Sequence, residues 1–208
     1  MIVDIFMLEL KGHTLLLASQ SPRRRELLEG LGVPFQVVKV EADETYPSNL
    51  KEGDIPLYIA RAKARAYEER LHEGELLLTA DTIVWCEKQM LGKPADAKEA
   101  HEMLQLLSGK THQVFTAVCI SWKDKEGMVW QNAFTERTDV TFQRLTDEDI
   151  DYYIENYRPF DKAGAYGIQE WIGYVGVTGI RGCYFNVMGL PLRPLYKALK
   201  QIVTENKN

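Results

Sequence analysis

Residues 15–25 read Leu15-Leu16-Leu17-Ala18-Ser19-Gln20-Ser21-Pro22-Arg23-Arg24-Arg25, and they predict a short buried strand that passes directly into a helix. The run of three leucines is typical of a buried strand. Ser21 is a good N-cap residue, and Pro22 suits the first helical position, where its missing N–H would have been unpaired. A strand followed at once by a helix is a common unit of α/β folds.

The start of this predicted helix is a candidate anion site. Unpaired N–H groups and the positive end of the helix dipole favour anions there. The hydroxyls of Ser19 and Ser21 and the guanidinium groups of Arg23 and Arg24 add donors at the same place. Cations near a helix N-terminus oppose the dipole, which favours a bound phosphate as their partner. The alternative is an ordinary capped helix with a solvated basic first turn.

The rest of the chain predicts a mixed α/β fold with a cleft. Further strands are expected at 35–40, 75–85, 114–121 and 128–142, and helices at 54–72, 96–107, 146–157 and from 191 onward. The apolar segment 76–84 predicts a central strand that is buried on both faces. Frequent glycines between 164 and 189 indicate tight turns rather than regular helix.

Composition excludes several classes of protein. The chain has 208 residues and a formal net charge of -5, which argues against nonspecific binding to nucleic acid or to an anionic membrane. Cys86, Cys119 and Cys183 are widely spaced and odd in number, which favours free thiols in a reducing compartment over disulfides or a zinc site. Residues 1–10 do not form a signal peptide, and no run approaches the roughly 20 apolar residues that span a bilayer. We therefore expect a cytoplasmic protein.

Asp81 is the strongest candidate for a catalytic residue. It lies inside an apolar strand, where a carboxylate is costly to bury unless it is paired, bound to a metal or protonated. A carboxylate at the solvated end of the strand, or one in a structural ion pair, is the alternative interpretation.

Four other residues support a phosphate-directed site. Glu44 ends an acidic run after a strand, Lys63 lies inside a helix, and Lys93 follows a glycine in a turn. Cations hold phosphates, and carboxylates hold Mg²⁺ or activate water. Gln169 can donate to and accept from the edge of a base. Taken singly, Lys63 is usually a solvated helix residue and Lys93 a turn charge, and the alternative for Gln169 is an amide that stabilises a turn.

Other common site motifs are missing from the sequence. It contains no phosphate-binding G-x-x-x-x-G-K-[ST], no dinucleotide-binding G-x-G-x-x-G after a strand, and no H-E-x-x-H metal motif. No G-x-S-x-G turn accompanies a Ser/His/Asp set. The four histidines lack the spacing of metal ligands.

An ordered series of motifs identifies a family. The series is Ser19-Gln20-Ser21-Pro22-Arg23-Arg24, Asp43-Glu44, Ala62-Lys63-Ala64, Ala80-Asp81-Thr82-Ile83-Val84, Gly92-Lys93-Pro94, Leu107-Ser108-Gly109-Lys110-Thr111-His112, Asp161-Lys162-Ala163-Gly164-Ala165-Tyr166-Gly167-Ile168-Gln169 and Asn186-Val187-Met188-Gly189-Leu190-Pro191. With it, the chain resembles the Maf family of nucleoside triphosphate pyrophosphatases from about residue 14 to residue 198. The resemblance implies a single Maf-like domain over 1–208, with an ITPase-like fold whose two lobes flank a cleft.

The resemblance also implies an activity and a set of site residues. The activity is hydrolysis of dTTP and UTP between the α and β phosphates, dependent on a divalent metal such as Mg²⁺, Mn²⁺ or Co²⁺, in an enzyme that is often a homodimer. Asp81 matches the general base, and Glu44, Lys63 and Lys93 match the other catalytic positions, with Glu44 and Asp81 as metal ligands. Substrate-binding positions fall on Ser19, Ser21, Arg23, Arg24, Thr82 and Gln169, of which Arg23, Thr82 and Gln169 match positions that select the base.

The chain departs from the family pattern at three places. Glu170 and Trp171 follow Gln169 where a glycine is common, and residues 181–185 differ from the usual run. Residues 1–13 extend beyond the usual start. A non-catalytic nucleotide-binding regulator of cell division or septum formation is the alternative function.

Overall fold

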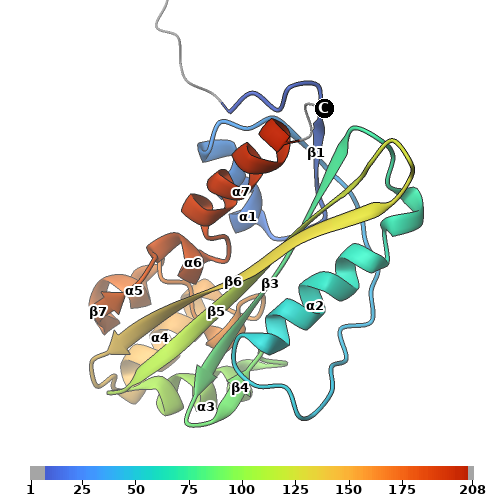
Figure 1. Ribbon diagram of the computed structural model, residues 1–208. Coiled ribbons are helices and arrows are strands. Elements are labelled where there is room, and N and C mark those ends of the chain that lie inside the picture. The colour runs from blue at the N-terminus through green and yellow to red at the C-terminus, as the bar shows by residue number, and fades with distance from the viewer. Residues whose placement is uncertain (1–7, 206–208) are drawn as a thin grey trace, which may run out of the picture.

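The computed structural model describes residues 8–205 and places seven strands in a single sheet (Figure 1). The order is β2-β1-β3-β5-β6-β7, and β4 also pairs with β3. Strands β1 and β2 are parallel, as are β1 and β3, and the other pairs are antiparallel. The strands are β1 Thr14–Leu17, β2 Phe35–Val37, β3 Glu75–Cys86, β4 Gln89–Leu91, β5 Thr111–Lys123, β6 Val129–Phe142 and β7 Val177–Arg181. The predicted mixed α/β fold is confirmed.

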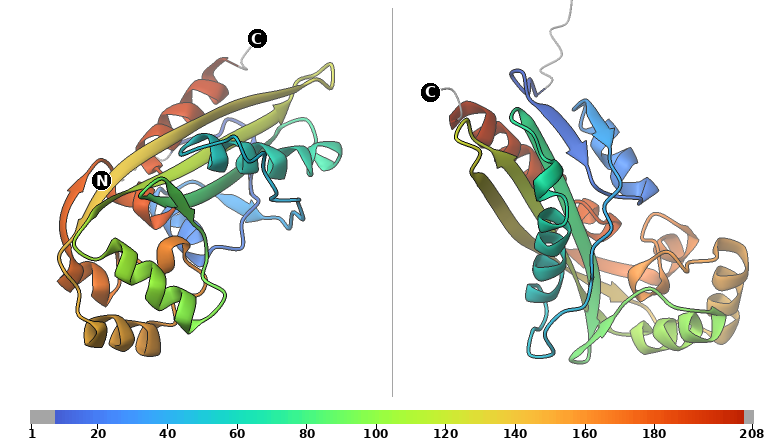
Figure 2. Two further views of the ribbon diagram at one scale, coloured as in Figure 1. Left: turned by 90° about the horizontal axis from the view of Figure 1, so that it is seen from below. Right: turned by 90° about the vertical axis from the view of Figure 1, so that its right-hand side faces the viewer.

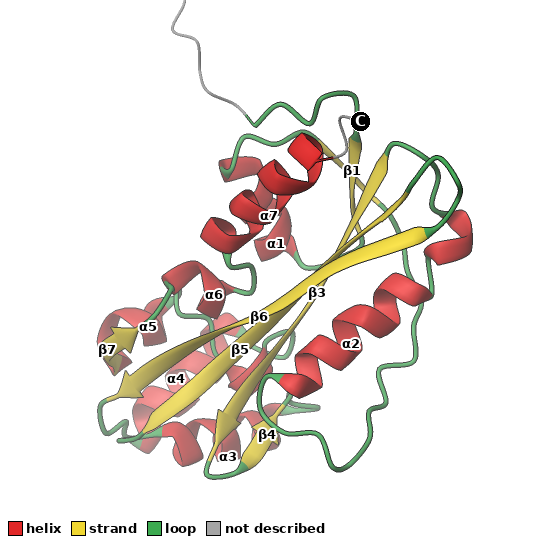
Figure 3. Cartoon of the chain, viewed as in Figure 1, coloured by secondary structure: helices red, strands yellow, loops and turns green. Residues whose placement is uncertain are grey.

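Helices cover the two faces of the sheet unequally. Helix α2 packs on one face, where Ala60 and Ala64 meet Leu77 and Cys119 in one core cluster. The larger core cluster lies on the other face and includes side chains from α1, α3, α4 and α7. Figure 3 shows this distribution of helices around the long strands. The helices are α1 Pro22–Gly30, α2 Asp54–Arg65, η1 Glu68–Arg70, α3 Ala97–Leu107, α4 Asp147–Tyr157, η2 Ala163–Ala165, α5 Trp171–Gly176, α6 Tyr184–Met188 and α7 Leu192–Glu205.

Two groups of elements stand at opposite ends of the strands. Figure 2 shows β1, β2 and α1 together at one end, and α3 and α4 together at the other. The long antiparallel strands β5 and β6 run past both groups. The arrangement agrees with the expectation of two lobes.

Side-chain capping hydrogen bonds are present at two of the predicted helix starts. The Asp96 side chain accepts from the N–H of Glu99 at the start of α3, 2.9 Å away. Thr146 and Asp149 form a reciprocal capping box at the start of α4. Ser21 stands at the N-cap position of α1 and Pro22 at its first position, as predicted, although the Ser21 side chain makes no capping hydrogen bond.

Part of the predicted N-terminal extension belongs to the core. Leu8 and Leu10 are buried in the larger core cluster, and residues 1–7 lie outside the described residues. Within residues 8–205, no helix has the length and apolar character needed to cross a membrane.

His112 is a buried histidine that the site does not use. Its ring lies edge-on to Phe142 and Tyr166, and Nε2 is 2.7 Å from the Tyr166 hydroxyl. Burial lowers the pKa of His112 to about 4, against 6.5 ordinarily. Since the unfolded chain binds this proton below pH 6.5 and the folded chain does not, His112 favours folding above pH 6.5. That contribution is lost as the pH falls from 6.5 toward 4.

We expect wild-type protein to lose about 3 kcal/mol more stability than His112→Gln between pH 7 and pH 4, because the amide does not titrate. Urea unfolding at the two pH values measures the difference. Equal losses in the two proteins would show that His112 does not titrate as its burial predicts.

Candidate functional site

A pocket lies beside an unpaired stretch of β3. Strand β1 pairs with β3 only as far as Leu78, and β4 pairs with it only from Val84 onward. Within the described part of the chain, residues 79–83 of β3 therefore have no strand partner on this edge. A cavity of about 560 Å³ lies along the gap, with the start of α1 on one side and residues 161–169 on the other. The gap opens at the carboxyl end of β1, a common place for ligand sites in α/β sheets.

The structure brings all ten sequence-predicted site residues to this pocket. They are Ser19, Ser21, Arg23, Arg24, Glu44, Lys63, Asp81, Thr82, Lys93 and Gln169. Five basic and three acidic side chains line the cavity, although the whole chain carries a net charge of -5. This local excess of positive charge favours an anionic ligand.

Asp81 and Thr82 lie on opposite faces of β3 because side chains alternate along a strand. Asp81 points to the α2 face, where Lys63 Nζ is 2.8 Å from its Oδ1 and 3.1 Å from Glu44 Oε1. Lys63 and Asp81 are mostly buried, whereas Glu44 is exposed. No donor among the described residues reaches Asp81 Oδ2. The carboxylate is thus held through one oxygen and has the other unpaired in the pocket.

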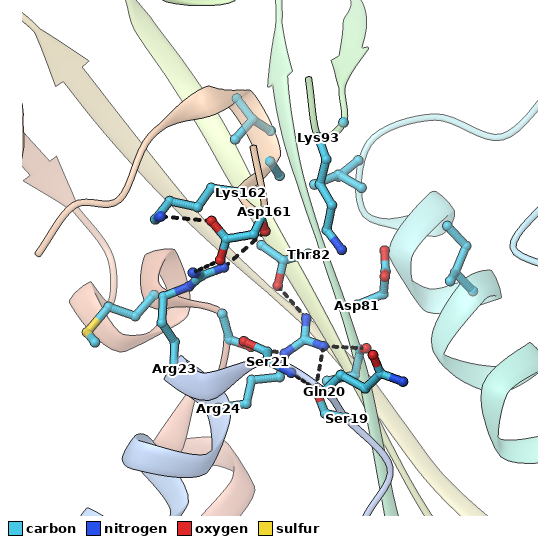
Figure 4. A pocket seen from close by; sticks show the side chains of 18 of the residues that line it. Ser19, Gln20, Ser21, Arg23, Arg24, Asp81, Thr82, Lys93, Asp161 and Lys162 are labelled. Carbon is cyan, nitrogen blue, oxygen red and sulfur yellow. Dashed lines mark hydrogen bonds and ion pairs between the residues drawn. The ribbon is translucent and has the colours of Figure 1, made fainter. Parts of the chain in front are cut away.

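Arg24 joins the start of α1 to the unpaired edge of β3. Its guanidinium donates to the carbonyls of Ala80, at 2.9 Å, and Gly189, at 2.8 Å. It also donates to the hydroxyls of Thr82, at 3.0 Å, and Ser19, at 3.5 Å (Figure 4). Burial lowers the pKa of Arg24, and the nearby Asp81 carboxylate acts in the opposite direction. Most of its donors are therefore committed to the protein.

The first turn of α1 has no side-chain cap, although Ser21 stands at the N-cap position. The Ser19 hydroxyl accepts from the backbone N–H of Ser21 at 3.2 Å. Lys93 enters the pocket from the side opposite Arg24 (Figure 4). Its side chain is exposed and has no ion pair within the described residues. The uncapped N–H groups and the Lys93 ammonium are available to an anion.

Gln169 brings an unsatisfied polar atom to the pocket. Its side-chain Oε1 is buried and has no hydrogen-bond partner within the described residues. A buried acceptor without a donor is costly, and a ligand N–H would satisfy it.

Two residues that the sequence reasoning did not assign to the site also line the pocket. Asp161 accepts from Arg23 Nη1 at 2.6 Å, and Lys162 Nζ lies 2.8 Å from its other oxygen. Burial acts to raise the pKa of Asp161, but hydrogen bonds from Lys162 and Arg23 lower it to about 2. Lys162 is buried, which is unusual for lysine. Both residues begin the motif 161–169 that ends in Gln169, and this position was the signal in the sequence that could have assigned them to the site.

Glu44 and Asp81 are the two carboxylates whose arrangement can be compared with that of a metal site. Among residues 8–205, no group of three or more His, Cys, Asp or Glu side chains is arranged to hold a metal ion. Glu44 and Asp81 each direct one oxygen at the Lys63 ammonium, so the two carboxylates converge on a single cation.

Comparison with solved structures gives a distant likeness. A HAM1 protein from Coxiella burnetii aligns with 93% of this chain and 99% of that chain, at 13% identity and a TM-score of 0.46. This similarity is too low to support an argument.

Comparison with sequence families gives a clear result. The model for Maf-like protein matches residues 14–202. A dTTP/UTP pyrophosphatase from Phocaeicola vulgatus is 54% identical over 93% of this chain and 98% of its own length. Proteins with the same name from Parabacteroides distasonis and Porphyromonas gingivalis are 53% and 49% identical, over 92% and 95% of this chain and 97% and 98% of their own lengths. The chain therefore belongs to the Maf family.

Proposed function

We propose that the chain is a nucleoside triphosphate pyrophosphatase that hydrolyses dTTP and UTP to the monophosphate and pyrophosphate. Modified pyrimidine nucleotides are further candidate substrates. One observation supports this most: a single pocket with excess positive charge joins the Lys63–Asp81 ion pair to an uncapped helix start. The names of relatives about 50% identical to the chain agree with the proposal.

The triphosphate is proposed to lie along the start of α1. The uncapped N–H groups there and the hydroxyls of Ser19 and Ser21 would donate to phosphate oxygens. Lys93, which has no carboxylate partner among residues 8–205, would neutralise phosphate charge from the other side. Because Arg24 is bonded to protein acceptors, we assign it mainly to shaping this surface.

Asp81 is proposed as the general base. Lys63 fixes its Oδ1, and Oδ2 is available to accept a proton from water. The water oxygen would then bond to the α-phosphorus as the bond from that phosphorus to the bridging oxygen breaks. Pyrophosphate carries away the electron pair of the broken bond.

Glu44 and Asp81 are also the proposed ligands of a divalent cation. Their convergence on Lys63 suits such a site, since Mg²⁺ is commonly held by one or two carboxylates together with phosphates. Mg²⁺, Mn²⁺ or Co²⁺ bound there would withdraw charge from the phosphoryl group. We expect EDTA to stop turnover and each added cation to restore it to a different degree, as measured by pyrophosphate release. Full turnover in EDTA would contradict the assignment.

The base is proposed to bind near Gln169. Thymine and uracil present an N–H between two carbonyls, and the unpaired Oε1 would accept from that N–H while the amide nitrogen donates to a carbonyl. Arg23, held by Asp161, is the second proposed base-selecting residue. The Thr82 hydroxyl is bonded to Arg24 and lies 3.0 Å from Thr116 Oγ1, so we propose that Thr82 acts by positioning Arg24.

Product analysis tests the proposed activity. Incubation in Mg²⁺ with dTTP, with UTP and with the deoxy- and ribonucleoside triphosphates of adenine, guanine and cytosine should release pyrophosphate fastest from dTTP and UTP, with dTMP and UMP as the other products. Release of a nucleoside diphosphate and inorganic phosphate would contradict cleavage between the α and β phosphates.

The non-catalytic regulator of cell division is not favoured. A pure binding protein has little need for an acid such as Asp81 in the pocket, held through one oxygen. Nucleotides that stay intact after prolonged incubation with metal would support the regulator instead.

We further propose a cytoplasmic homodimer. Cys86, Cys119 and Cys183 are free thiols, which suits a reducing compartment. Exposed apolar side chains such as Tyr174 and Phe185, on α5 and α6, offer surface for a second copy. Light scattering coupled to gel filtration distinguishes a dimer from a monomer.

A further inference from the structure

Glu170 lies next to Gln169 and binds two buried partners. Its Oε2 accepts a short hydrogen bond from the Tyr153 hydroxyl, and its Oε1 is 3.1 Å from Lys162 Nζ. The Glu170 side chain is 19% exposed and that of Lys162 is 8% exposed. This carboxylate is therefore mostly buried, and it does not itself line the pocket.

Tyr153 connects the carboxylate to the backbone of the turn before Gln169. It is fully buried in α4, and its oxygen accepts from the N–H of Gly167 at 2.9 Å. Burial and the Glu170 carboxylate raise the pKa of Tyr153, so the hydroxyl keeps the proton that it donates. Glu170 and the Gly167 N–H are thus held by one side chain.

Gly167 allows two side chains to close over the turn. A Cβ at this position would lie 2.8 Å from Glu170 Cδ and 3.0 Å from Gln169 Nε2. Contacts below 3.0 Å are essentially never seen for real Cβ atoms. The amide of Gln169 therefore rests against the same glycine as the carboxylate of Glu170, and its position depends on where that carboxylate is held.

The same network reaches the start of α1. Lys162 bridges Glu170 and Asp161, and Asp161 holds Arg23 through its carboxylate and through its carbonyl oxygen. An unbroken series of contacts thus joins the turn that carries Gln169 to the guanidinium of Arg23.

We propose that Glu170 is a positioning residue that, through Tyr153 and Lys162, holds Gln169 and Arg23 in the arrangement that binds the nucleotide base. The inference rests on the proposed function, because it assigns the base end of the same pocket. It makes base recognition, and not phosphate binding, depend on Glu170.

The test compares a ligand with a base and a ligand without one. Calorimetry measures binding of α,β-methylene-dTTP, which resists cleavage between the α and β phosphates, and of inorganic tripolyphosphate. Glu170→Gln should weaken binding of the nucleotide analogue about tenfold and change binding of tripolyphosphate less than about twofold. Tyr153→Phe, which removes the hydroxyl that bonds both Glu170 and the Gly167 N–H, should give the same pattern without altering charge.

Controls and a double variant separate positioning from a general loss of stability. Tyr152 and Glu155 are exposed residues of α4, so Tyr152→Phe and Glu155→Gln should leave the binding of both ligands unchanged. When Gln169→Ala is already present, Glu170→Gln should weaken binding of the nucleotide analogue little further, since the amide that Glu170 positions is gone.

Each remaining outcome contradicts a particular statement. If Glu170→Gln lowers only Tm, or weakens both ligands equally, Glu170 does not position the base site. If the losses in binding free energy of the analogue caused by Glu170→Gln and by Gln169→Ala add fully in the double variant, the two residues do not act together. If the wild-type protein binds neither ligand, the proposed function itself is wrong, and the inference fails with it.

Discussion

Asp81→Asn is expected to lower kcat for dTTP hydrolysis by about 100-fold or more, the usual loss when a general base is removed. Asparagine has the same shape, and its oxygen still accepts from Lys63, which keeps Glu44 as a second partner. The change therefore removes the proton acceptor in the pocket while the surrounding contacts are retained.

The measurement is pyrophosphate release under saturating dTTP and Mg²⁺, with Tm recorded in parallel. Asp54→Asn is the matched control, since Asp54 is exposed at the start of α2 and does not line the pocket. It should keep wild-type kcat. A kcat for Asp81→Asn within a few-fold of wild type would exclude Asp81 as the base and leave its ion pair with Lys63 as a structural feature.

Arg24→Ala is expected to lower both stability and activity. It removes the donors that reach Ala80, Gly189 and Thr82, and a buried acceptor left without a donor costs about 1–3 kcal/mol. A total near 3 kcal/mol would lower Tm by roughly 6–12 °C in a chain of this length. Because the start of α1 would no longer be tied to β3, kcat/KM for dTTP should also fall about 100-fold.

The neighbouring arginine provides the control. Arg25 is on the same helix, and its buried Nε has no hydrogen-bond partner in the described structure, so Arg25→Ala leaves no comparable set of acceptors unpaired. We expect it to cost less than about 1 kcal/mol. Arg24→Lys, with one ammonium in place of the planar guanidinium, should recover only part of the loss. Equal effects of Arg24→Ala and Arg25→Ala would contradict the special role of Arg24.

Local signals predicted the elements that depend on neighbours in sequence. The strand and helix around Ser19, the capped starts of α3 and α4, and the paired strands β5 and β6 all match the pattern. The ten candidate site residues were predicted from residue types in their local context and from an ordered series of motifs, and the structure places them around one pocket. Their individual roles remain proposals.

The sequence did not predict features that depend on contacts with residues far along the chain. Strand β2 ends at Val37 and not at residue 40, because β1, its partner, already ends at Leu17. Helix α2 ends at Arg65 instead of His72, and there the hydrogen bonds tighten, as Tyr67 donates to Ala64. No glycine or proline marks that end.

The glycine-rich region was predicted as turns, but it contains α5, β7 and α6. Strand β7 exists through its pairing with β6, which local sequence does not reveal. Strand β4 was missed for the same reason, since it is three residues long and is defined by its pairing with the end of β3.

Because Asp81 and Thr82 point to opposite faces of β3, the effect of an inserted or deleted residue on the site depends on where in the chain it falls. A single residue inserted between Leu78 and Asp81 would turn every later side chain of β3 to the other face, so the Asp81 carboxylate would leave Lys63 for the face of Arg24, and the Thr82 hydroxyl would leave Arg24. The turn at 124–127, far along the same sheet, carries no such constraint, because β5 and β6 are aligned by their own long pairing. We therefore expect insertions and deletions to be tolerated at that turn and to disrupt the site when they fall in the middle of β3.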